Sequence, residues 1–149
     1  CACGIVENRE QQVVQTVGHT DCILLDEPTN GLDIPSKADF RKLLLKRADE
    51  NTTIIISTHQ VRDVENMIDP IIILAHDAVL LNANVQTIAE KLCFSIDSAE
   101  VPGALYSEPQ PGGYMNVTVN TTGEESQVNI EALFNTVLRN RETIAKLFN

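Results

Sequence analysis

The sequence predicts an α/β fold that carries a small α+β appendage at its C-terminal end. Four apolar residues in a row, Cys22–Leu25, are too few for a helix and suit a buried strand. The β-branched, apolar run Thr53–Ser57 is typical of a second buried strand. An amphipathic segment lies between the two runs, and from about residue 98 the composition shifts to Pro and Gly.

The first predicted strand ends in two adjacent carboxylates, Asp26 and Glu27, and Pro28 follows at once. Two charges at the end of a buried strand cost several kcal/mol unless something compensates them. Open α/β sheets bind their ligands just beyond the carboxyl ends of the strands. We therefore expect the pair to meet a metal ion and a polar ligand there.

A helix is predicted over about 35–48. Pro35 suits a first helical position, and Phe40, Leu43 and Leu44 follow at helical spacing among basic residues. The basic residues are expected to form a solvated face, and an anion site is the alternative.

After His59 the sequence pattern predicts a series of short helices and strands. A short helix comes first and ends before Pro70. Two apolar runs at 71–75 and 79–81 then form a hairpin, and an amphipathic helix occupies about 85–92.

We place a boundary near residue 93, which divides the chain into portions 1–92 and 93–149. The second portion is predicted to hold one alternating strand and two helices with apolar stripes. These are Tyr114–Asn120, Ile130–Leu138 and Ile144–Phe148.

Composition excludes some classes of function. The 149 residues fit one domain, and the net charge of −10 argues against a groove that tracks a nucleic-acid backbone. The four cysteines lack the spacing of a zinc site and fit a reducing compartment. No run is long enough to span a membrane and no signal-peptide pattern is present, while a first residue that is Cys rather than Met indicates a fragment.

Two motifs resemble those of the ATP-binding cassette (ABC) ATPases. The stretch Cys22–Asp33 is similar to the Walker B strand and D-loop of that family, and Thr53–His59 is similar to its H-loop strand and histidine. The two motifs occur in the family's order, and 59 − 27 = 32 positions separate Glu27 from His59. The resemblance implies part of a P-loop NTPase core with a mostly parallel sheet, followed by the appendage.

The resemblance also implies roles for single residues. The carboxylate of Asp26 would hold Mg²⁺, and Glu27 would polarise the attacking water as a general base. His59 would donate a hydrogen bond to the γ-phosphate. The D-loop residues Asn30, Gly31 and Asp33 would reach toward the opposite subunit's nucleotide. The alternatives are that the two acids only cap a strand or bind loop amides, and that Asn30-Gly31 is a plain turn.

Other family motifs are missing from these residues. Ala2–Val6 falls where the family's signature would lie, and only Gly4 matches it. No Gly-x-x-x-x-Gly-Lys-Ser/Thr loop occurs, and none of the seven glycines precedes a Lys. That loop supplies most of the N–H groups that bind phosphate. We therefore expect the 149-residue chain alone not to hydrolyse ATP.

The resemblance implies the ATP-binding subunit of an ABC transporter, with ATP and Mg²⁺ as cofactors. The expected partners are a second ATP-binding subunit and a transmembrane permease, with no nucleic acid. Such a subunit works in the cytoplasm, at the inner face of the cell membrane. The alternative is a non-catalytic interaction module that retains an ATPase remnant, in which the stripe Ile130–Leu138 would be a docking face.

Overall fold

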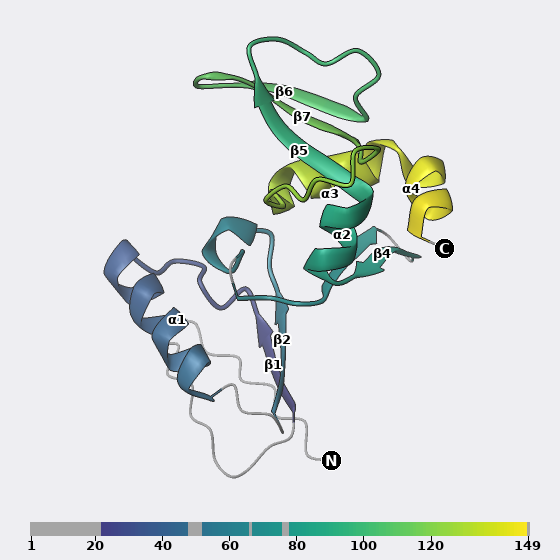
Figure 1. The fold of residues 1–149 in the computed structure, drawn as a ribbon. Coiled ribbons are helices and arrows are strands. Elements are labelled where there is room, and N and C mark those ends of the chain that lie inside the picture. Colours follow the sequence, from purple (N-terminus) through teal and green to yellow (C-terminus); the bar gives the residue numbers. More distant parts are fainter. Residues whose placement is uncertain (1–21, 48–51, 66, 76–77, 149) are drawn as a thin grey trace. The chain divides into compact units, whose positions relative to one another are not determined.

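A computed structural model describes residues 22–47, 52–65, 67–75 and 78–148 (Figure 1). The chain divides into two compact units, Cys1–Met67 and Ile68–Asn149. The mixture of strands and helices confirms the predicted α/β class. The predicted signature region Ala2–Val6 lies outside the described residues.

In the first unit a strand, a helix and a strand follow one another, as predicted. β1 (Cys22–Asp26) and β2 (Thr53–Ser57) pair in parallel, and α1 (Ile34–Arg47) lies between them in the sequence. Parallel strands need a long crossover connection, which a helix supplies. In the register Asp26 stands opposite Ser57. Both strands therefore end at the same edge of the pair.

The expectation that both strands are buried on each face is wrong for the described structure. Leu24 is 41% exposed and Ile55 is 49% exposed, whereas Ile23 and Ile54 are half-buried. Successive residues of a strand point to opposite faces, so one face of this pair is open. An apolar strand is buried on both sides only where layers cover both faces of its sheet.

The helix predicted after His59 is reduced to a single 3-10 turn at Val61–Asp63. The prediction rested on Val61, Val64 and Ile68, of which the first two are three positions apart. That spacing also suits a 3-10 turn, where residues i and i+3 stand above one another. Val64, which follows the turn, is 1% exposed.

The second unit begins with the predicted hairpin and helix. β3 (Ile71–Ala75) pairs in antiparallel fashion with β4 (Ala78–Ala83). α2 (Val85–Lys91) follows, and the Asn84 side chain caps it by accepting a hydrogen bond from the Thr87 N–H at 2.7 Å.

A three-stranded antiparallel sheet forms next, in the order β5-β7-β6. Its strands are β5 (Leu92–Asp97), β6 (Tyr106–Gln110) and β7 (Gly113–Val119). Only the central strand β7 was predicted.

Two helices complete this unit at the predicted places, α3 (Ile130–Arg139) and α4 (Arg141–Phe148). α3 contacts β6 and β7 and also β3 and β4, while α4 contacts β4. Leu133, Val137 and Ile144 have no exposed surface. The predicted stripe Ile130–Leu138 therefore packs largely within its own unit.

The second compact unit begins at Ile68, before the boundary predicted near residue 93. The hairpin and α2 belong to it because β3 and β4 pack against α3 and α4. A compact unit and a family boundary are different divisions of a chain, so the portions 1–92 and 93–149 stay a prediction.

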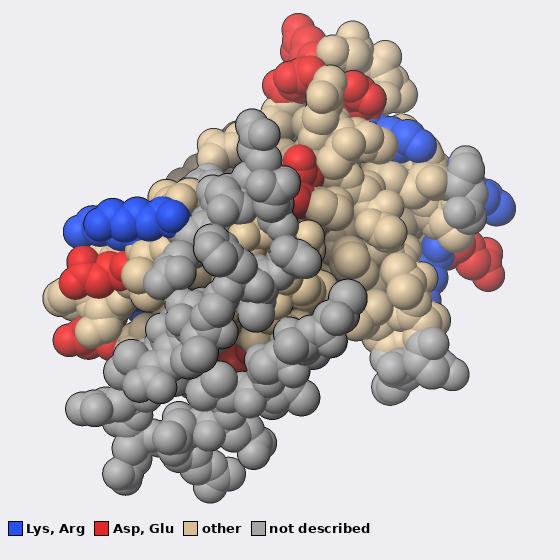
Figure 2. All heavy atoms as spheres, turned by 90° about the horizontal axis from the view of Figure 1, so that it is seen from below, with Lys and Arg blue, Asp and Glu red and all other residues tan. Residues whose placement is uncertain are grey.

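The surface and helices of the described residues add two observations. On the face that Figure 2 shows, Lys and Arg side chains of the described residues form no continuous basic band. Among the described helices, none has the length and apolar character to cross a membrane.

Candidate functional site

The site lies where the two parallel strands end. The pairing continues one residue beyond β1, because the Glu27 N–H donates to the Ser57 carbonyl at 2.7 Å. This bond places Glu27 beside Thr58 and His59, which leave β2. The strand register brings these residues to the same edge of the strand pair, as predicted.

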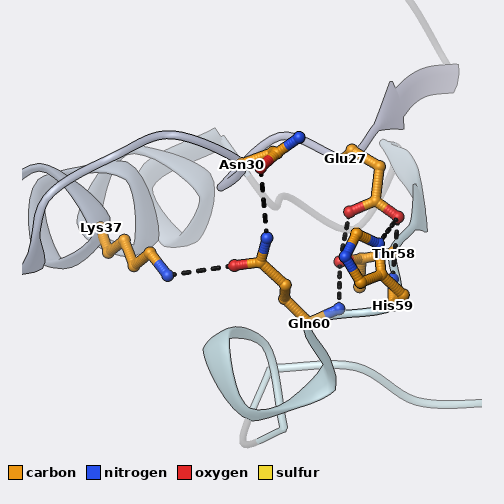
Figure 3. Close-up of polar contacts among 6 residues, drawn as sticks. All are labelled: Glu27, Asn30, Lys37, Thr58, His59 and Gln60. Atoms are coloured by element: carbon orange, nitrogen blue, oxygen red, sulfur yellow. Dashed lines mark hydrogen bonds and ion pairs between the residues drawn. The ribbon is translucent and has the colours of Figure 1, made fainter.

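Glu27 and His59 are in direct contact (Figure 3). Glu27 Oε1 accepts a hydrogen bond from the His59 backbone N–H at 2.8 Å and lies 2.7 Å from His59 Nδ1. Glu27 Oε2 accepts a hydrogen bond from the Thr58 hydroxyl at 3.1 Å. Burial alone would raise the pKa of Glu27, but the hydrogen bonds from His59 and Thr58 outweigh it and lower the pKa below its ordinary value of 4.5. The carboxyl group is therefore ionised at neutral pH.

The contact fixes the proton on the imidazole. An ionised carboxylate only accepts hydrogen bonds, so His59 Nδ1 carries the proton that it shares with Glu27. A neutral ring then has only a lone pair at Nε2. The ring can donate at Nε2 as well only as the imidazolium. The His59 side chain is 73% exposed, which leaves this second nitrogen accessible to a ligand.

Glu27 has an unusual backbone, with φ at 45°. A left-handed conformation costs a residue with a side chain about 1–2 kcal/mol. Such strain occurs mainly where the surrounding structure enforces it, and it is concentrated at functional sites. Here the hydrogen bonds of the Glu27 backbone N–H and of the Glu27 carboxylate hold the conformation.

The chain after Glu27 makes a tight turn. The Asn30 N–H donates to the Glu27 carbonyl at 3.1 Å, and the Leu32 N–H donates to the Thr29 carbonyl at 3.2 Å. Gly31 has φ at 78°, as expected for a position that favours residues without a side chain. A plain turn is enough to explain these hydrogen bonds and the φ of Gly31. The D-loop roles of Asn30 and Gly31 stay predictions.

Asp33 stands apart from the contact between Glu27 and His59. Its Oδ1 accepts a hydrogen bond from the Ser36 N–H at 2.9 Å, which caps the first turn of α1. This bond lowers the pKa of Asp33. The predicted contact with an opposite subunit is untested.

Asp26 ends β1 and is exposed. Among the described residues, no three His, Cys, Asp or Glu side chains cluster closely enough to hold a metal ion. Mg²⁺ keeps several waters and needs only one or two carboxylates beside the phosphates. The exposed carboxylate of Asp26 fits that requirement, and its role as a Mg²⁺ ligand stays a prediction.

Sequence reasoning missed a polar cluster behind this site. Lys37 of α1 donates to Gln60 Oε1 at 3.2 Å, and its ammonium lies 2.7 Å from Asp63 Oδ2. Burial alone would raise the pKa of Asp63, but Lys37 and Thr29 lower it. Lys37 is therefore not a member of a merely solvated basic face. No local pattern links it to residues more than twenty positions away.

No family model matches the chain. It is 28% identical over 88 residues to an uncharacterized ABC transporter ATP-binding protein of Methanocaldococcus jannaschii. These 88 residues cover 59% of this chain and 34% of that protein. It is 36% identical over 61 residues to the energy-coupling factor transporter ATP-binding protein EcfA2 of Mycoplasmoides gallisepticum, covering 41% of this chain and 19% of that protein. It is 26% identical over 141 residues to ABC transporter A family member 7 of Arabidopsis thaliana, covering 95% of this chain and 13% of that protein.

The fold and the similarities are consistent with a partial ABC ATPase region. The chain is similar to part of the ABC transporter ATP-binding proteins. It spans about a third or less of the length of these relatives.

Proposed function

We propose that this chain is the C-terminal portion of an ATP-binding subunit of an ABC transporter. The intact subunit pairs with a second ATP-binding subunit, hydrolyses MgATP at their interface and drives a transmembrane permease. It works in the cytoplasm at the inner face of the cell membrane, and it binds no nucleic acid. The similarity to ABC transporter ATP-binding proteins supports this proposal.

The observation that carries the proposal is the contact between Glu27 and His59 at the ends of two parallel strands. An ionised carboxylate at this edge suits a general base that accepts a proton from an attacking water. His59 orients that carboxylate through both its backbone N–H and its ring. As the imidazolium, the same ring also supplies an Nε2–H donor to a phosphate oxygen.

The other site residues have supporting roles in the proposal. Asp26 contributes an exposed carboxylate to Mg²⁺ beside the nucleotide phosphates. Asn30, Gly31 and Asp33 form and follow the turn that faces the opposite subunit. Mg²⁺ held there would supply electrostatic stabilisation of charge on the phosphates.

The test compares two variants of the intact subunit, Glu27→Gln and His59→Ala. Removing a general base costs about 10²- to 10⁴-fold in rate, so we expect kcat for MgATP hydrolysis to fall at least a hundredfold in Glu27→Gln. His59→Ala is expected to lower kcat as well. Lys42→Met is the matched control, because among the described residues Lys42 pairs with Asp39 on the exposed face of α1, away from Glu27 and His59. A Glu27→Gln subunit that keeps more than a tenth of the wild-type kcat would falsify the assignment.

The 149-residue chain alone is expected neither to bind MgATP at micromolar concentration nor to hydrolyse it. Its sequence holds no phosphate loop to contribute backbone N–H donors and a Lys. Isothermal titration of the chain with MgATP checks this expectation. Micromolar binding would contradict it.

A further inference from the structure

Gln60 lies at the centre of the polar contacts behind the proposed site (Figure 3). Its backbone N–H donates to the Thr58 hydroxyl oxygen at 2.9 Å, and that hydroxyl donates to Glu27. Its side chain lies between Lys37 of α1 and Asn30 of the turn. One residue thus contacts the helix and the turn as well as the segment that holds Glu27.

Lys37 determines which way the Gln60 amide faces. An ammonium group only donates hydrogen bonds, so the Gln60 oxygen must face Lys37, 3.2 Å away. Lys37 is itself held by Asp63 at 2.7 Å, and its side chain is only 22% exposed. The Gln60 nitrogen is therefore left to face Asn30.

The same reasoning extends to Asn30. The Gln60 nitrogen donates to Asn30 Oδ1 at 3.4 Å, which is a long and weak hydrogen bond. Because the Asn30 oxygen faces Gln60, the Asn30 NH₂ group points away from it, as Figure 3 shows. Asn30 is exposed. It thus presents two N–H donors at the outer side of the turn.

We infer that Lys37 and Gln60 are positioning residues that orient the Asn30 amide as a hydrogen-bond donor toward an anionic oxygen ligand. The inference rests on the proposed function, in which Asn30 faces nucleotide phosphate at the interface with a second subunit. A donor at this position favours a phosphate oxygen, whereas an outward carbonyl oxygen would repel it. The polarity of Asn30 is therefore set by an ammonium group on another element.

The substitution Gln60→Glu tests this polarity. A carboxylate at position 60 accepts from Lys37 but has no donor for Asn30. Asn30 then turns its NH₂ group inward and presents its oxygen to the ligand. The new charge lies beside Lys37, so the chain is expected to unfold at the same temperature as wild type or higher. A merely structural role for Gln60 predicts instead that activity and stability fall together.

We expect Gln60→Glu to lower kcat for MgATP hydrolysis by the intact subunit at least tenfold. Gln60→Met, which removes the donor without adding charge, is expected to lower it about threefold and keeps the test valid if the first variant fails to fold. Both losses of kcat should disappear when Asn30 is already Ala, because Gln60 then has no Asn30 amide to orient.

The outcomes separate the two claims. An unchanged kcat in Gln60→Glu, or an equal loss with and without Asn30→Ala, overturns the positioning role of Gln60 and leaves the ATPase assignment standing. A wild-type intact subunit that hydrolyses no MgATP overturns the ATPase assignment, and the positioning role of Gln60 is overturned with it.

Discussion

Glu27 has a strained backbone and an ionised side chain, and both features have the same source. Its N–H bonds to Ser57 while its carboxylate bonds to Thr58 and His59, so the end of β2 holds both parts of the residue. Either feature alone has a structural explanation. Together they describe a carboxylate held in one orientation at the end of a strand.

The left-handed backbone of Glu27 predicts an unusual order of stabilities. Glu27→Ala and Glu27→Gly both remove the carboxylate, but only Gly adopts φ near 45° without strain. We expect the Gly variant to be more stable than the Ala variant by about 1 kcal/mol. Urea unfolding of the full chain, followed by a signal from the first unit, measures this difference. Gly loses about 0.5–1 kcal/mol more than Ala to the entropy of the unfolded chain. An Ala variant that is more stable by that amount would therefore show that the conformation carries no strain.

Sequence reasoning could predict that Glu27 and His59 lie close together, because strand register and motif spacing determine it. It could not predict Gln60 or Lys37. Their contacts depend on how side chains from α1 and from the residues after β2 meet, and the intervening sequence holds no periodic signal for that. The basic run of α1 looked like a solvated face because only the fold brings Asp63 to Lys37.

At the scale of elements, strands and helices with a clear apolar pattern were predicted well. The bounds of α1 agree with the predicted 35–48 to within one residue at each end. β5 was missed because Leu92 also continues the apolar face of α2, which ends one residue earlier. β6 was missed because it contains Pro109, and the edge position of β6 in the sheet tolerates a residue without an N–H.

The cap of α1 predicts different effects for two substitutions of Asp33. Asn caps a helix about as well as Asp does, whereas Ala cannot accept the hydrogen bond from the Ser36 N–H. We therefore expect Asp33→Ala to lower the thermal unfolding midpoint of the first unit and Asp33→Asn to leave it nearly unchanged. Circular dichroism melting of the full chain measures both.

The same pair of variants separates the cap from the proposed D-loop role. In the intact subunit, a loss of ATPase activity that Asp33→Asn shares with Asp33→Ala belongs to the carboxylate itself. Activity lost only in the Ala variant belongs to the cap. Equal melting midpoints for both variants and wild type would contradict the capping role.

At the scale of the whole molecule, the buried apolar residues are divided unevenly between the two units. Among the described residues, Pro28, Leu44 and Val64 are the buried apolar side chains of the first unit, and all the others belong to the second. Purely parallel sheets are rarely stable without cover on both faces, yet Leu24 is 41% exposed and Ile55 is 49% exposed here. The proposed function accounts for this, since β1 and β2 would then be part of a larger sheet.

This difference predicts how fast backbone amides exchange with solvent. In the isolated chain we expect amides of β1 and β2 to exchange well before those of β5, β7 and α3, because regions with few buried contacts open locally at low free energy. In the intact subunit, protection of β1 and β2 should rise to the level of the second unit, while that of α3 should hardly change. Hydrogen–deuterium exchange with mass spectrometry on both proteins measures this, with α3 as the internal reference. If β1 and β2 exchange equally fast in both, the open face of the strand pair is a property of the native protein, and these strands do not belong to a larger ATPase sheet.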